Sequence, residues 1–323
     1  MTCVFLSAAS LITVLTAAAG CKAANQQHSL GSRIFFFIKS HNTGSYFSAG
    51  SAWARLITSN TEYIGVNSTS PSTDNDKIRM IADNKVQAAF INGPEAGMAY
   101  HGDPVYWKQP QPLRALFALW PASYNLIAQK SSGIDKIGDI KGKSIAIFSA
   151  KSASGDMLEY FLGLYGITEN NTQIYRVSEN IGVMLFIRKE VDCIWYNMEY
   201  DELNTQYPSP ANLQSIPADD LYKLIPVQPD SRLTEFLKAY PYFYLDDSRL
   251  MTAGFAACSA QMSEEAAYRM TKLWWENEDL IKQYVPDKLK LINRESNRNG
   301  IPVPFHPGAL RYLREAGLIP ENS

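Results

Sequence analysis

The chain has 323 residues, a length that suggests about two domains. Hydrophobic residues make up 46% of the sequence and charged residues 19%, which is ordinary for a globular protein. The net charge of -2 argues against a nucleic-acid partner, because a phosphate backbone is bound by a basic surface.

The first residues are predicted to be a targeting signal. Val4–Ala19 is apolar apart from Ser and Thr, and it is short for a membrane span but suits the core of a signal peptide. Small residues lead directly to Cys21, and this arrangement resembles a bacterial lipobox. We therefore expect a signal peptide over residues 1–20, lipidation of Cys21 and a polar tether over residues 21–32. A plain secretory leader that is cleaved nearby is the alternative.

Lipidation of Cys21 can be tested directly. Mass spectrometry of the mature protein should find an acylated cysteine at the N-terminus, because a lipobox cysteine becomes the first residue after cleavage. An unmodified N-terminus at any other residue would contradict this expectation.

Three strand–turn–helix units follow the tether. Buried strands alternate with turns of small polar residues and with apolar positions at helical spacing, which predicts a parallel sheet covered by helices. The predicted strands are Arg33–Ile38, Tyr63–Asn67 and Val86–Ile91, and the helices carry Tyr46 to Ile57, Ile78 to Ile81 and the residues after Glu95.

Two apolar runs, Leu113–Leu119 and Tyr124–Gln129, flank Trp120–Ser123, where we place the crossing into a second lobe. Another round of strands and helices follows, and Arg249–Ala257 is the predicted return strand. This gives lobe 1 as residues 33–122 and 250–323, and lobe 2 as residues 123–249. The remaining predicted strands are Ser144–Phe148, Gln173–Val177, Val191–Tyr196 and Leu213–Pro217, and the predicted helices are the segment from Asp156, Asn180–Arg188, Glu199–Glu202, Arg232–Ala239, Ser263–Tyr284 and Ala309–Glu315.

The stretch Lys143–Leu164 has the layout of a ligand-binding turn. The strand Ser144–Phe148 leads through a hydroxyl-rich turn into a helix, and such a turn can aim backbone N–H groups at a ligand. Ser152 or Ser154 is the expected N-cap. An ordinary, well-capped α/β connection is the alternative.

Signals for catalysis and for metal binding are missing from the sequence. The four histidines and four cysteines lack ligand spacing, and no Gly-x-Ser-x-Gly motif is present. We therefore expect no metal, no cofactor and no enzyme activity. Cys193 and Cys258 could form a disulfide or stay as two buried thiols.

The segment Pro304–Gly317 resembles the His-Pro-Gly-Ala…Arg-Tyr…Glu-x-Gly ending of the TAXI subfamily of TRAP transporter solute receptors. We expect a structural role for it, with His306 packed or hydrogen-bonded rather than touching a ligand. Three further turns are similar to the family's turns: Thr43–Tyr46, Thr69–Asn75 with Pro71 in place of Gly, and Asp139–Lys143. Asn92–Pro94 stands where the family often has Gln-Ser-Asp, and Ser152–Asp156 occupies the place of its Gly-Ser-Gly-Thr. The sequence therefore departs from the family mainly in the turns expected to line the cleft.

The resemblance implies a two-lobe, type II-like periplasmic-binding-protein fold. Each lobe would be a mainly parallel sheet flanked by helices, with the ligand cleft between the lobes. It implies a monomeric lipoprotein in the periplasm of a Gram-negative bacterium, held to the membrane by its lipid anchor alone. Such receptors deliver a small polar solute, often an amino acid or a carboxylate, to a TRAP-type permease. A secreted enzyme or a ligand-sensing lipoprotein on the same scaffold are the alternatives.

Ligands of open α/β sheets bind beyond the C-terminal ends of the strands. The turns at these ends supply the predicted ligand-binding residues. Tyr196, at another strand end, could pack on the solute, and the alternative is that this strand aromatic belongs to the core. An ammonium or hydroxyl-rich part of the solute is expected at Asp156, unless Asp156 points to solvent and only stabilises its helix. The full predicted set is Thr43, Ser45, Tyr46, Thr69, Ser70, Ser72, Asn92, Ser123, Ser152, Ser154, Gly155, Asp156 and Tyr196.

Overall fold

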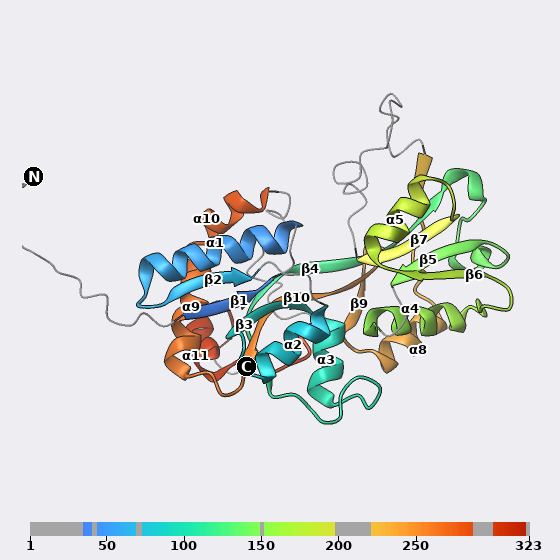
Figure 1. Ribbon diagram of the computed structural model, residues 1–323. Coiled ribbons are helices and arrows are strands. Elements are labelled where there is room, and N and C mark those ends of the chain that lie inside the picture. Colours follow the sequence, from blue (N-terminus) through green and yellow to red (C-terminus); the bar gives the residue numbers. More distant parts are fainter. Residues whose placement is uncertain are drawn as a thin grey trace, which may run out of the picture. The chain divides into compact units, whose positions relative to one another are not determined.

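A computed structural model describes residues 35–320 apart from 41–43, 69–72, 149–151, 198–220 and 287–299. Its described strands form one mixed sheet in the order β2-β1-β3-β10-β4-β7-β5-β6, with β8 paired to β4 and β9 paired to β10 (Figure 1). The bounds are β1 Phe35–Lys39, β2 Ile64–Ser68, β3 Ala88–Asn92, β4 Leu113–Gln129, β5 Ser144–Phe148, β6 Gln173–Val177, β7 Cys193–Asn197, β8 Tyr222–Leu224, β9 Phe243–Asp246 and β10 Arg249–Ser259.

The sheet contains two parallel sets of strands. The first set is β1, β2 and β3, and the second set is β5, β6 and β7. The long strands β4 and β10 pair antiparallel with each other, and each also pairs antiparallel with one parallel set. The predicted architecture of parallel strands covered by helices is therefore confirmed in both sets.

The described α-helices are α1 Gly44–Asn60, α2 Asp74–Ala82, α3 Gly93–His101, α4 Ala153–Leu164, α5 Glu179–Ile187, α8 Ser231–Ala239, α9 Glu264–Glu276, α10 Glu278–Tyr284 and α11 Pro307–Glu315, with short 3-10 helices η1 Lys130–Ser132 and η2 Ile137–Ile140.

Three regions differ from the sequence prediction. The two runs around Trp120–Ser123 are one strand, β4, because Pro121 lies beside a bulge, where a missing N–H interrupts no regular ladder. The predicted helix Ser263–Tyr284 is two helices, which meet at Asn277. The strands β8 and β9 were not predicted. The predicted strand Leu213–Pro217 and helix Glu199–Glu202 lie outside the described residues.

Each parallel set has an aromatic core. Trp53 of α1 stacks on Phe90 and meets Phe117 and Trp274 edge-on, all of them buried. On the other set, Phe161 packs against Trp195 and Phe236. Such ring pairs contribute about 0.5–1.5 kcal/mol beyond their buried area.

The described helices include none that is long and apolar enough to span a bilayer. Cys193 and Cys258 are buried free thiols, which is the second of the two alternatives.

The C-terminal segment has the structural role that the sequence predicts. His306 is buried, its Nδ1 accepts from the Gly308 N–H at 3.3 Å, and its Nε2 lies 2.9 Å from the Met262 carbonyl. The ring is therefore neutral, with the proton on Nε2, and burial lowers the pKa of His306. The Ala115 N–H donates to the Pro304 carbonyl, and the His306 N–H donates to the Ala115 carbonyl. These backbone hydrogen bonds hold the start of α11 against β4.

Gly308 is required by close packing between α11 and α9. A Cβ at this position would overlap the carbonyl oxygen of Glu264. We expect Gly308→Ala to lower the free energy of unfolding by about 1–3 kcal/mol, as overpacking does, in urea titrations. Gly163→Ala is the matched control, because Gly163 lies in α4 with open space around it. Gly163→Ala should leave the free energy of unfolding unchanged or raise it by up to about 1 kcal/mol. Equal effects of both changes would contradict this account.

Candidate functional site

The C-terminal ends of the first parallel set bring polar side chains together. The register of β1 with β2 places Ile38 beside Asn67 and Lys39 beside Ser68. Ser40 Oγ donates to Asn67 Oδ1 at 2.9 Å, and Lys39 Nζ lies 3.4 Å from Ser68 Oγ. Lys39 and Ser40 are fully buried, and burial together with the charge of Lys77 lowers the pKa of Lys39.

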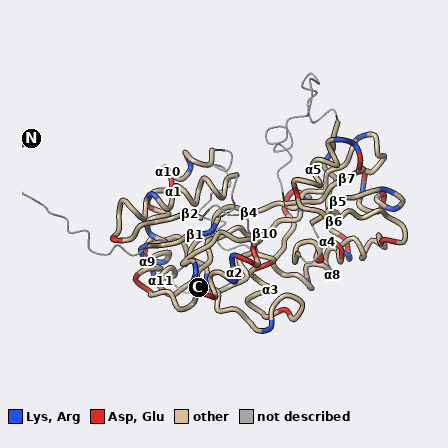
Figure 2. Tube along the Cα trace, in the orientation of Figure 1, with Lys and Arg blue, Asp and Glu red and all other residues tan. Residues whose placement is uncertain are grey.

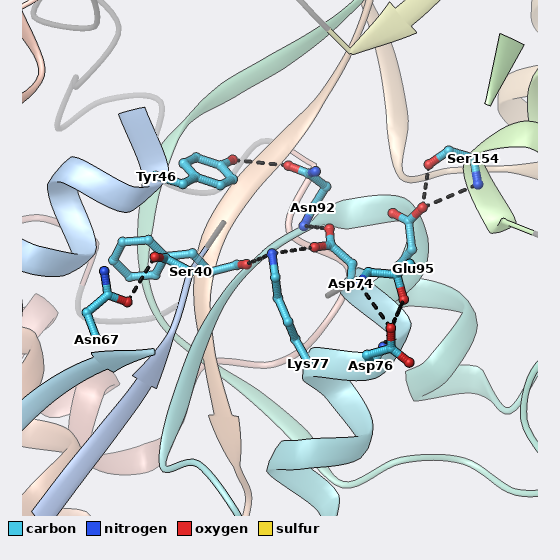
Figure 3. Close-up of polar contacts among 11 residues, drawn as sticks. Ser40, Tyr46, Asn67, Asp74, Asp76, Lys77, Asn92, Glu95 and Ser154 are labelled. Carbon is cyan, nitrogen blue, oxygen red and sulfur yellow. Dashed lines mark hydrogen bonds and ion pairs between the residues drawn. The ribbon is translucent and has the colours of Figure 1, made fainter. Parts of the chain in front are cut away.

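A buried ion pair joins α2 to this end of the sheet (Figure 3). Lys77 Nζ lies 2.8 Å from Asp74 Oδ1 and donates to the Phe90 carbonyl at 3.0 Å. Asp74 Oδ2 accepts from the backbone N–H of Asn92 at 2.9 Å. A capping box between Thr73 and Asp76 starts α2 and so fixes the direction of the Asp74 side chain. The ion pair therefore sets the position of Asn92 at the end of β3.

Asn92 also contacts α1. The Tyr46 hydroxyl donates to Asn92 Oδ1 at 3.0 Å (Figure 3). Burial and the negative charge of Asp74 raise the pKa of Tyr46, so the hydroxyl stays protonated and remains a donor. Gly254 of β10 leaves the space that this hydroxyl occupies, because a Cβ there would overlap it.

The start of α4 faces the start of α3. Ser152 caps α4 by accepting from the Gly155 N–H at 3.0 Å. Ser154 donates its hydroxyl and, at 3.3 Å, its backbone N–H to Glu95 Oε1 (Figure 3). Because that hydroxyl proton points at Glu95, the Tyr124 hydroxyl is the donor in its 3.0 Å bond to Ser154 Oγ. Burial and Asp74 raise the pKa of Glu95 to about 7, although the bonds from Ser154 oppose the rise.

A second contact joins the same two regions. The Tyr106 hydroxyl, from the loop after α3, donates to Asp156 Oδ2 in the first turn of α4. Burial and Asp156 raise the pKa of Tyr106. Asp156 is exposed, but its carboxylate meets Tyr106 rather than solvent alone.

The structure brings part of the predicted set together. Tyr46 and Asn92 bond to each other at the strand ends of the first parallel set. The start of α4 holds four more predicted residues: Ser152, Ser154, Gly155 and Asp156. Ser45 lies half-buried in the first turn of α1. Ser123 is buried in β4 and accepts from Asn125 Nδ2 at 2.8 Å. Four predicted residues lie outside the described residues: Thr43, Thr69, Ser70 and Ser72.

Tyr196 requires a correction. It is fully buried in β7, and its hydroxyl donates to the carbonyls of Ile147 and Val177. Gly182 of α5 leaves room for its ring. Tyr196 is therefore a core side chain and is removed from the candidate site, because its polar atom already has backbone partners.

Four buried charged or hydroxyl groups were not predicted from the sequence: Lys39, Asp74, Lys77 and Tyr124. No role was predicted for Glu95 or Tyr106. Lys39 directly follows an apolar strand, and Asp74 and Lys77 have the i, i+3 spacing of a helix pair, so weak signals existed. Residues of both charge signs occur along both parallel sets in the described part of the chain (Figure 2). Among the described residues, no group of three or more His, Cys, Asp or Glu side chains could hold a metal ion.

Comparisons with solved structures agree with this architecture. XAC2383 from Xanthomonas citri, bound to ATP, is similar with a TM-score of 0.51 and 11% identity, over 88% of this chain and 96% of that chain. The periplasmic aliphatic sulphonate binding protein SsuA from Escherichia coli matches with a TM-score of 0.47 and 11% identity, over 80% of each chain. The chain has a mixed α/β fold, a central sheet flanked by helices, as predicted, and it shares this fold with XAC2383.

The family follows from the sequence match. Residues 40–317 match the NMT1-like family. This range covers most of the chain and nearly all of the described residues, so the chain belongs to the NMT1-like family.

Two ion pairs in α2 allow a test of the buried pair. Lys77→Met leaves Asp74 buried without its countercharge, so we expect the free energy of unfolding to fall by roughly 3–5 kcal/mol, measured by urea denaturation. Arg79→Met is the control, because Arg79 and Asp76 have the same i, i+3 spacing but are exposed, at 3.7 Å. That change should cost within about 1 kcal/mol. A loss for Lys77→Met no larger than the control's would contradict the role of the buried pair.

Proposed function

We propose that this chain is an extracytoplasmic solute-binding receptor, which captures a small polar solute and delivers it to a membrane transporter. The observation that carries the proposal is the meeting of two βα turns from different parallel sets. Glu95 at the start of α3 contacts Ser154 at the start of α4. In open α/β folds, ligands bind at such strand ends. Membership of the NMT1-like family and the fold shared with periplasmic binding proteins support the proposal.

The mechanism we propose is closure of two lobes around the solute. Lobe 1 would be residues 33–122 and 250–323, and lobe 2 residues 123–249, with β4 and β10 as the two connections. A solute that contacts both Asn92 and Ser154 favours the closed state, because it binds that state more tightly than the open one. The hydroxyl and amide groups of these turns suit a polar solute such as an amino acid or a carboxylate.

The partner and location are finer parts of the proposal. The similarity of Pro304–Gly317 to the ending of TAXI receptors favours a TRAP-type permease as the partner. An ABC-type permease is the alternative, because periplasmic sulfonate-binding proteins of the SsuA type are among the structures with a similar fold. We place the protein in the periplasm as a monomer, anchored through Cys21. Uptake by cells that carry either type of permease, with and without this receptor, distinguishes the two partners.

The test of the proposed function starts from the purified mature chain. Mass spectrometry after denaturation should release a small polar solute, and small-angle scattering should show a more compact protein when that solute is returned. A solute that emerges chemically changed would favour an enzyme. If no solute co-purifies and none from a broad metabolite panel raises the melting temperature, the proposal fails.

A variant at the strand end makes the test specific to the site. Asn92→Ala removes the amide side chain at the end of β3, which accepts the hydrogen bond from the Tyr46 hydroxyl. We expect the affinity for the co-purified solute to fall about tenfold, which corresponds to about 1.4 kcal/mol, in calorimetric titrations. Asn60→Ala at the end of α1 is the control, because its amide bonds only the Leu56 carbonyl among the described partners. Unchanged affinity in Asn92→Ala would remove this strand end from the binding site.

A further inference from the structure

Glu95 has one carboxylate oxygen without a partner. Its Oε1 accepts both bonds from Ser154, whereas its Oε2 is buried and has no hydrogen-bond partner among the described residues. The residue is only 8% exposed. A buried carboxylate oxygen without a donor is unfavourable, so this position calls for a proton or for a donor from a bound molecule.

The charges around this oxygen are negative or neutral. Asp74 raises the pKa of Glu95 through its negative charge, and the hydroxyls of Tyr106 and Tyr124 lie close enough for Glu95 to raise their pKa in turn. Lys77 bonds to Asp74 instead. Asp156 adds a further carboxylate in the first turn of α4. A second carboxylate from a solute would therefore meet repulsion at this end of the site.

Glu95 also occupies the position that a solute anion would otherwise take. The first turn of a helix attracts anions, and the N–H and hydroxyl of Ser154 are the groups that would bind one. In this chain both already donate to Glu95. The carboxylate of Glu95 thus takes the place of a solute carboxylate at the start of α4 (Figure 3).

We propose that Glu95 determines the specificity of the receptor: it selects solutes that present an ammonium or another N–H donor group to its second oxygen, and it rejects solutes that present a carboxylate there. This inference rests on the proposed function. A solute reaches the oxygen when the contact between α3 and α4 opens, and its N–H group then supplies the missing donor. The rest of the solute extends toward Asn92 and the end of the first parallel set.

Binding of such a solute is linked to a proton. Burial and Asp74 raise the pKa of Glu95 to about 7, so a fraction of the molecules carries a proton on this carboxyl near neutral pH. An ammonium group favours the ionised carboxylate and expels that proton. The affinity for a cationic solute therefore rises with pH through this range, because deprotonated Glu95 is the binding form. A purely structural contact between α3 and α4 predicts no proton release that depends on the solute's charge.

The experiment uses matched solutes of three to six carbons: ω-amino acids such as 4-aminobutanoate, and dicarboxylates such as succinate. We expect calorimetry to show at least tenfold tighter binding of the best amino acid than of the dicarboxylate of equal length. Titrations in buffers of different ionisation enthalpy should show release of a fraction of a proton near neutral pH, and this release should shrink as the pH is raised. Glu95→Gln should reduce the preference at least tenfold and abolish the proton release. Asp83→Asn, an equal charge change on an exposed residue paired with Lys85, should alter neither.

Three outcomes overturn the inference. The first is a preference for the dicarboxylate in the wild-type protein, and the second is an unchanged preference in Glu95→Gln. The third is a co-purified solute without any N–H donor, which would leave the proposed function standing. If no solute of the series or of the metabolite panel binds, both the inference and the proposed function fail.

Discussion

The ion pair between Lys77 and Asp74 is the interaction on which the site depends. It is buried, so removal of either charge takes from the other its ion-pair partner in a region that water does not reach. It holds the start of α2 against the end of β3 and fixes the backbone of Asn92. From Asn92 the chain turns directly into α3, which presents Glu95. One charged pair thus sets the positions of the polar groups on the first parallel set.

The second parallel set contributes a capped helix start, with one exposed carboxylate, Asp156, in its first turn. Ser152 caps α4, and Ser154 directs two donors at Glu95. The two sides are chemically unequal. One carries a buried ion pair, and the other carries hydroxyls, backbone groups and the exposed carboxylate of Asp156. The costly buried pair therefore lies on the first parallel set.

Much of the fold was predictable from the spacing of apolar residues, which differs between strands and helices. Ser144–Phe148 and Gln173–Val177 were predicted with the observed bounds. The single strand through Pro121 was not, because a proline is tolerated there only by a bulge that pairing with β10 creates. Of the site, sequence indicated the hydroxyl-rich turns but not the buried charges. Lys39 and Lys77 resemble surface lysines in sequence, and only the folded neighbours show them buried. Tyr196 shows the reverse, since an aromatic residue at a strand end looks the same whether it faces a solute or the core.

The pairing of β4 with β10 has a mechanical consequence. Both strands run from one parallel set to the other, and they are hydrogen-bonded to each other over most of their length. Such a connection is a two-stranded antiparallel ribbon and not two independent hinges. It can flex out of the plane of the sheet and twist, whereas stretching or shearing it would break a ladder of bonds. One of the two register shifts in this ladder lies at Gly254, beside the hydroxyl of Tyr46. The interruption of the ladder is therefore next to the side chain that donates to Asn92.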